Sequence, residues 1–159
     1  MNDNHHQRDC LDIARLEILN RDAIHVKRRN FDLSKYYKER GFNLKFSAWN
    51  QIFEGYKRNE MRSIDSTFNN FAKICTKLPG QCIASIKPGY DNDCVLRFIV
   101  KDCYALANIN YKQKNGFGVY SSQPVIVFEL GECVEAKIDR ITLKRIKRKA
   151  KCDSNVFRI

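Results

Sequence analysis

Gln81-Cys-Ile-Ala-Ser-Ile-Lys87, Pro88-Gly-Tyr-Asp-Asn-Asp93 and Cys94-Val-Leu-Arg-Phe-Ile-Val100 are the consecutive segments that decide the fold. The first and third alternate with the two-residue period of β-strands. The segment between them is rich in residues that favour turns, through a fixed φ, a positive φ or side-chain bonds to the backbone. A β-hairpin is therefore expected here. Upstream of Gly80 the apolar period is helical, so the sequence predicts an α+β domain.

Four helical segments are expected before the hairpin. Two of them carry clear apolar stripes at spacings of three and four residues, formed by Trp49, Ile52, Phe53 and Tyr56 and by Phe68, Phe71, Cys75 and Leu78. The other two have helix formers or capping residues, and the first could be one long helix or two short ones. The four segments are residues 9–30, 32–41, 47–62 and 63–78.

The sequence after the hairpin predicts more strands and a final basic segment. Strands are expected at 104–111, 119–120 and 125–128, with a loop at 112–118 and a hairpin turn at Gly131. Residues 134–138 fit a strand or a helix, and we interpret them as a strand. Propensity favours a helix in the segment that follows, although the pattern of residues 139–151 leaves helix and strand open.

Length and composition predict one folded domain. The 159 residues include ten Phe, seven Tyr and one Trp, and 43 % of the chain is apolar, which suffices for a hydrophobic core. We expect a flexible N-terminus at 1–8, a single α+β domain at 9–151 and a tail at 152–159. In this domain N-terminal helices pack on a C-terminal antiparallel β-sheet.

The net charge of +11 favours a polyanionic partner, because a positive field concentrates polyanions near the surface. Nucleic acid is the commonest such partner, and charge alone does not separate DNA from RNA or fix the oligomeric state. No window approaches the roughly 20 apolar residues of a membrane span, so no membrane partner is expected. Seven cysteines and an N-terminus without an apolar signal core predict an intracellular, reducing location, cytoplasmic or nuclear.

Positive charge gathers near the C-terminus. Apolar residues interleave with these charges, so the segment can anchor on the core and present its cations to phosphates. The leading hypothesis is a non-catalytic nucleic-acid-binding protein, and the alternatives for this segment are a solvated face or a localisation signal. The basic residues are Lys137, Arg140, Lys144, Arg145, Lys147, Arg148, Lys149 and Lys151.

The order of elements across residues 47–100 resembles that of winged-helix DNA-binding modules, in architecture only. In such an arrangement residues 64–77 form the helix that enters the major groove, and residues 87–97 form the wing. Lys73 and Lys77 then join the nucleic-acid contacts. The polar residues expected on the same face are Ser63, Ser66, Thr67, Asn69 and Asn70.

A small nuclease is the second hypothesis. Glu135 and Lys137 have the acid-x-lysine spacing of metal-dependent nucleases, in which carboxylates hold Mg²⁺ and the lysine contacts the phosphate. His25 could instead act as the general base of a metal-free ribonuclease. A metal-dependent site needs a further upstream acid, and the candidates are Asp91, Asp93, Asp102 and Glu129.

Other site chemistries receive weaker support. The cysteines lack the close paired spacing of zinc sites, although Cys82, Cys94 and Cys103 could converge on neighbouring strands. No phosphate loop or dinucleotide fingerprint occurs, so no cofactor is expected. A structural or host-directed interaction protein of a virus or mobile element is the third hypothesis. Aromatic residues that could stack on bases are Tyr36, Tyr37, Tyr90, Tyr111 and Phe117.

Overall fold

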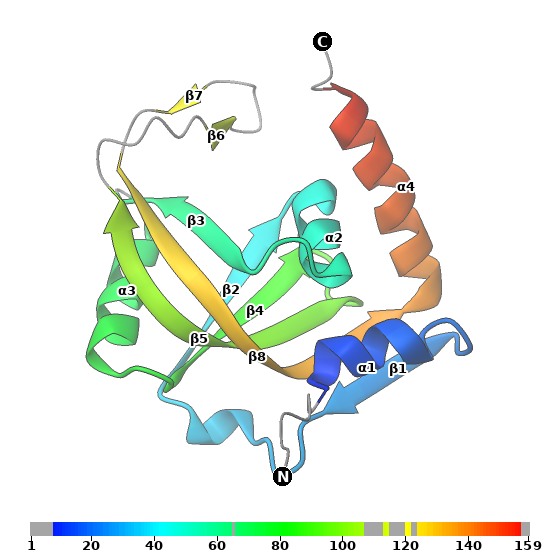
Figure 1. Cartoon of the computed structure of the whole chain (residues 1–159), viewed down its shortest axis with the longest axis horizontal. Coiled ribbons are helices and arrows are strands. Elements are labelled where there is room, and N and C mark those ends of the chain that lie inside the picture. Colours follow the sequence, from blue (N-terminus) through cyan, green and yellow to red (C-terminus); the bar gives the residue numbers. More distant parts are fainter. Residues whose placement is uncertain (1–7, 65, 107–112, 115–119, 122–123, 157–159) are drawn as a thin grey trace, which may run out of the picture.

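One long strand organises the fold. The computed structural model describes residues 8–64, 66–106, 113–114, 120–121 and 124–156. Strand β8 (Val125–Asp139) pairs with β5 (Val95–Leu106) along one side. On its other side, β8 pairs first with β3 (Asn59–Ser63) and then with β1 (Ala23–Lys27). The second half of β8 therefore lies between β1 and β5, with one end leading directly into the last helix (Figure 1).

The sheet is completed by β4 (Cys82–Pro88), which pairs antiparallel with β5, and by β2 (Lys38–Leu44), which pairs parallel with β4. The six-stranded sheet is therefore mixed. Two short strands, β6 (Gln113–Lys114) and β7 (Tyr120–Ser121), form a separate pair.

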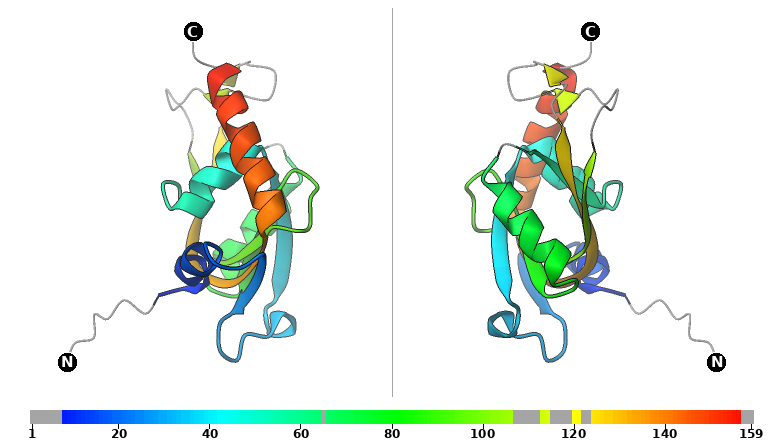
Figure 2. Two further views of the ribbon diagram at one scale, coloured as in Figure 1. Left: turned by 90° about the vertical axis from the view of Figure 1, so that its right-hand side faces the viewer. Right: turned by 90° about the vertical axis from the view of Figure 1, so that its left-hand side faces the viewer.

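Each of the four α-helices in the described part of the chain contributes side chains to the core, and their ribbons lie around the sheet in Figures 1 and 2. A short 3-10 helix, η1, precedes β2. The helices are α1 (Cys10–Glu17), η1 (Leu33–Lys35), α2 (Phe46–Glu54), α3 (Phe68–Lys77) and α4 (Arg140–Val156).

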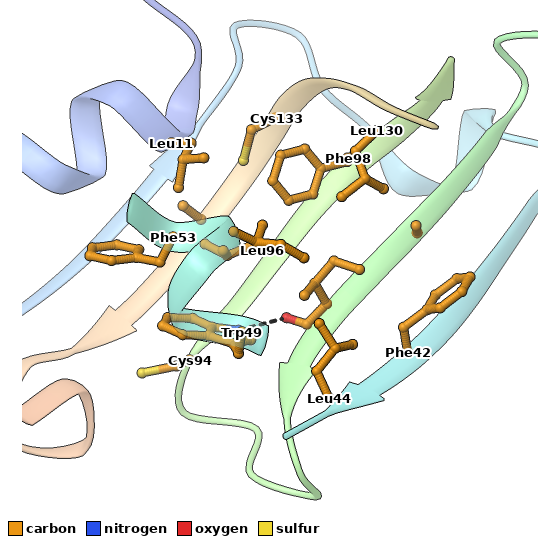
Figure 3. Packing of buried hydrophobic residues seen from close by; sticks show 14 of the residues in the cluster. Leu11, Phe42, Leu44, Trp49, Phe53, Cys94, Leu96, Phe98, Leu130 and Cys133 are labelled. Atoms are coloured by element: carbon orange, nitrogen blue, oxygen red, sulfur yellow. Dashed lines mark hydrogen bonds between the residues drawn. The ribbon is translucent and has the colours of Figure 1, made fainter. Parts of the chain in front are cut away.

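Alternate residues of the strands form the main core. Phe98 of β5 and Phe128 of β8 are fully buried on the same face of the sheet, beneath the helices. Trp49 of α2 is also fully buried, stacks on Phe53 with ring centroids 5.4 Å apart, and donates from Nε1 to the carbonyl of Ile86 at 3.2 Å (Figure 3). The helix α2 is thereby fixed to the middle of the sheet.

The predicted α+β class is confirmed, as are the β4–β5 hairpin and a helix within the expected 63–78 segment. The helix expected over 47–62 is confirmed only in its first half, because α2 ends at Glu54. The expected strand at 134–138 is the end of β8, and the following basic segment is helical. Helix α4 continues beyond residue 151 to Val156. Most of the expected 112–118 loop and most of residues 1–8 lie outside the described residues.

The two N-terminal helix predictions are wrong in part. Helix α1 ends at Glu17, and residues 23–27 form β1, where Ile24 and Val26 point toward the core and the backbone pairs with β8. Similarly, Asp32 caps only the short η1, and residues 38–44 form β2. Long-range pairing with β8 and β4 outweighs local helix propensity in both places.

Three further expectations are corrected in the sheet. It is not purely antiparallel, because β2 and β4 are parallel. Residues 59–63, expected at the end of a helix, form β3. Gly131 does not close a hairpin: β8 continues through it, with register shifts nearby against β5. A Cβ at Gly131 would lie only 3.1 Å from the carbonyl oxygen of Ile99, so close backbone approach explains the glycine.

Candidate nucleic-acid interface

Asp139, the one acidic residue of the basic segment, caps the N-terminus of helix α4. Asp139 Oδ2 accepts hydrogen bonds from the backbone N–H and the hydroxyl of Thr142, each 2.9 Å long. These hydrogen bonds lower the pKa of Asp139 below its ordinary value, the backbone bond contributing most. The carboxylate is thus engaged at the start of the helix.

The inner side of α4 is anchored on the protein body. Leu143, Ile146 and Ala150 are buried, and α4 packs mainly on α2. Ion pairs flank this contact: Lys147 binds Glu54 of α2, and Arg145 binds Asp91 in the β4–β5 turn. The ammonium of Lys149 lies 5.3 Å from the ring centroid of Phe46, which is compatible with a cation–π contact.

The outer side of α4 carries a second set of cations, which we call the α4 stripe. It consists of Arg140, Lys144, Arg148 and Lys151, which recur at spacings of four, four and three residues. At 3.6 residues per turn they fall on one side of the helix. The last three are exposed, and none of the four forms an ion pair with the side chains that the structure describes, which in α4 end at Cys152. No acid occurs between Arg140 and Cys152 in the sequence.

The other predicted basic contacts lie elsewhere. Lys137 is on β8, in register with His25, and its side chain is exposed beside that histidine rather than on α4. Lys73 and Lys77 are exposed on α3, and the ribbon views place α3 and α4 on opposite sides of the molecule (Figures 1 and 2). The predicted ten-residue set is therefore divided into an α4 group, a sheet residue and an α3 pair.

The arrangement around α3 does not support the winged-helix interpretation. Phe71 and Cys75 are buried and Lys73 is exposed, so the predicted division of faces is present. The following hairpin, however, supplies two inner strands of the sheet, with β2 beside β4 and β8 beside β5. A wing that contacts DNA needs a hairpin free to reach the backbone.

The other face of the sheet carries a polar network that sequence reasoning missed as a unit. Glu135 Oε1 accepts from Arg97 Nη1 at 2.8 Å, and Glu135 Oε2 lies 2.6 Å from His25 Nε2. The same arginine donates from Nε to Glu39 at 2.9 Å, and Ser85 donates to that glutamate. These residues come from five different strands, so no local spacing in the sequence could have revealed them.

Charge pairing in this network outweighs desolvation. Burial alone would raise the pKa of Glu39, but hydrogen bonds from Ser85 and Arg97 bring it below its ordinary value of 4.5. Burial alone would lower the pKa of Arg97, yet Glu39 and Glu135 raise it. Because the pKa of Glu39 is lowered on folding, its stabilising contribution is present above pH 4.5 and is lost as the pH falls through the lowered pKa.

Glu135 and Lys137, the acid-x-lysine pair, do not have the surroundings that a metal-dependent nuclease needs. Both oxygens of Glu135 are engaged by His25 and Arg97. Asp102 pairs in register with Glu129 at the β5–β8 contact beyond the bulges, and Asp91 is bound to Arg145. Within the described ranges, no three His, Cys, Asp or Glu side chains gather closely enough to hold a metal ion.

Of the three candidate cysteines, Cys82 and Cys103 lie near each other and beside Cys75, whereas Cys94 contacts the carbonyl of Asp139. Burial raises the pKa of Cys103 to about 11, which disfavours the thiolate.

The tyrosine candidates differ in exposure. Tyr36 accepts a hydrogen bond from Arg28 and is half-buried. Tyr37 and Tyr90 are exposed by 66 % and 90 % and could meet a base. Tyr111 and Phe117 lie outside the described residues.

Among the helices of the described residues, none has the length and apolar character needed to cross a membrane. Comparison of the chain with protein-family models, curated proteins and solved structures gave no match.

Proposed function

We propose that the protein binds nucleic acid by laying the phosphate backbone along the α4 stripe. The observation that carries this proposal is the division of the α4 cations into a paired and an unpaired set. Arg145 and Lys147, which flank the packed side of the helix, are paired with the protein's own acids. The outer stripe of four cations has no such partners among the side chains described up to Cys152, and it can meet external anions.

The dimensions of the stripe suit a phosphate backbone. Residues three or four apart on a helix lie about 6 Å from one another, and the eleven-residue rise from Arg140 to Lys151 is about 16 Å. The helix backbone is already ordered and holds these charges at a fixed spacing. The conformational entropy lost on binding is therefore mainly that of the long Lys and Arg side chains. Contacts of this kind are to phosphates, so the binding is expected to be independent of base sequence.

The chemistry of the stripe is shared by DNA and RNA ligands. We place the protein in a reducing compartment, on the support of seven cysteines that are all unbridged thiols. Either nucleic acid is then an available partner.

A salt titration tests the proposal. Fluorescence anisotropy with duplex DNA, single-stranded DNA and RNA of about 20 nucleotides measures affinity from about 50 to 200 mM salt. Four phosphate contacts predict a slope of about −3.6 for log K against log salt on duplex DNA, a loss of roughly 100-fold over this range. Absence of binding to all three at the lowest salt, or binding that does not respond to salt, rejects the proposal.

A further inference from the structure

We propose that His25 and Glu135 form a metal-free acid–base site that cleaves the phosphodiester bond of RNA by transfer to its own 2′-hydroxyl. This inference rests on the proposed function, because it takes the bound polyanion as the substrate. It adds a second site, on the sheet face that carries the polar network, and it commits the substrate to RNA.

The geometry of the pair suits proton transfer. Because a carboxylate accepts, the Nε2–H of His25 donates to Glu135, and the neutral imidazole then carries its free lone pair on Nδ1. Half of the His25 side chain is exposed, whereas only 11 % of the Glu135 side chain is exposed. The buried carboxylate, itself held by Arg97, thus orients a reachable imidazole.

Two exposed lysines flank the histidine. Lys137 lies opposite His25 in the β1–β8 register, and Lys27, two residues along β1 on the same face, lies opposite Glu135. Lys27 lies near Asp32 in a neighbouring pocket but forms no ion pair with it, and both ammonium groups can hold the non-bridging oxygens of a phosphodiester. Arg97 is less suited to that role, since both Glu39 and Glu135 already neutralise it.

The site opens toward α4. A surface pocket of about 490 Å³ is lined by His25 and Lys137 together with Asp139, the residue that caps α4. Asp93 of the β4–β5 turn also faces this pocket. The first member of the α4 stripe, Arg140, follows directly in the chain. A strand that tracks the stripe toward Arg140 therefore reaches the pocket, and its next phosphates can enter beside His25.

The reaction needs no metal or co-reactant. Nδ1 of His25 takes the proton of the 2′-hydroxyl while the 2′-oxygen forms a bond to phosphorus. The bond from phosphorus to the 5′-oxygen, on the opposite side of the phosphorus, breaks. That leaving oxygen takes a proton from solvent water, and the imidazolium returns its proton to solvent. The products are a 2′,3′-cyclic phosphate and a 5′-hydroxyl. His25 is the catalytic residue, and Glu135 is a positioning residue.

The test compares wild type with His25→Gln, purified identically, in buffer containing EDTA. One substrate is a ribodinucleotide, which is too short to span the stripe, and the other is an end-labelled RNA of about 20 nucleotides. Wild type is expected to cleave both substrates and to leave cyclic-phosphate ends. The His25→Gln variant is expected to lose at least about 100-fold in cleavage rate.

Two further measurements test the mechanism. A DNA chimera with one internal ribonucleotide should be cut only 3′ of that residue. Glu135→Gln should lower kcat about tenfold and leave KM unchanged.

Several outcomes overturn the inference: no cleavage by wild type, equal cleavage by His25→Gln, or cleavage that appears only when Mg²⁺ replaces EDTA. Anisotropy on the same RNA, extended with a 2′-O-methyl version that cannot react, measures binding separately. Retained binding without cleavage rejects the acid–base site and leaves the α4 proposal standing. Cleavage of the dinucleotide without salt-dependent binding of the longer RNA does the reverse.

Discussion

Replacement of all four α4-stripe residues by glutamine is expected to weaken binding to duplex DNA by roughly 100-fold at 50 mM salt and to remove most of the salt dependence. The variant is Arg140→Gln, Lys144→Gln, Arg148→Gln and Lys151→Gln. Glutamine has nearly the helix propensity of lysine and arginine and keeps an aliphatic stem with a polar end. Helix α4 should therefore stay folded on Leu143 and Ile146. Anisotropy measures affinity, and circular dichroism checks the fold.

A matched variant separates position from net charge. Arg29→Gln, Lys35→Gln, Lys38→Gln and Lys101→Gln also remove four positive charges, all from exposed positions outside α4. This control should change affinity by only a few-fold, through the weaker long-range field. Equal losses in the two variants would mean that binding follows total charge and not the α4 stripe.

The second large effect concerns the core. Trp49→Ala is expected to lower the free energy of unfolding by about 4 kcal/mol, because it removes a fully buried aromatic side chain and leaves a cavity beside Phe53. It also leaves the carbonyl of Ile86 without the indole N–H that it accepts from. Urea denaturation followed by circular dichroism measures the change, and a cost below about 1 kcal/mol would contradict this packing.

Tyr56→Ala is the control for that measurement. Tyr56 was placed on the same apolar stripe as Trp49 by spacing alone, but 86 % of it is exposed, since α2 ends at Glu54 and Gly55 turns the chain with φ of +89°. Its replacement should change stability by no more than about 0.5 kcal/mol. The pair of variants thus tests where the helix ends as well as what it buries.

Periodicity predicted the parts of the fold whose partners are near in sequence. The helix around Trp49, the helix around Phe71 and the β4–β5 hairpin all follow from local patterns. The strands β1 and β3 could not be recognised this way, because each pairs with β8, more than 60 residues further along the chain. Such pairings determine whether a short segment becomes helix or strand, and a local window does not contain them.

The candidate sites also differ in how much of each can be predicted from local sequence. The basic run of α4 was visible in the sequence, because a helix of consecutive charges needs no distant information. Which cations remain available was not visible, since Glu54 and Asp91 reach Lys147 and Arg145 only through folding. His25 and Glu135 were each noted separately, and only the β1–β8 register brings them within hydrogen-bonding distance.

The central claim, that the outer side of α4 is the surface that meets nucleic acid, is tested most directly by mapping bound oligonucleotide on ¹⁵N-labelled protein. Titration with an oligonucleotide should move the backbone amide resonances of Arg140, Lys144, Arg148 and Lys151 most, with α3 nearly unchanged. Shifts concentrated at Lys73 and Lys77, or spread evenly over the surface, would contradict it.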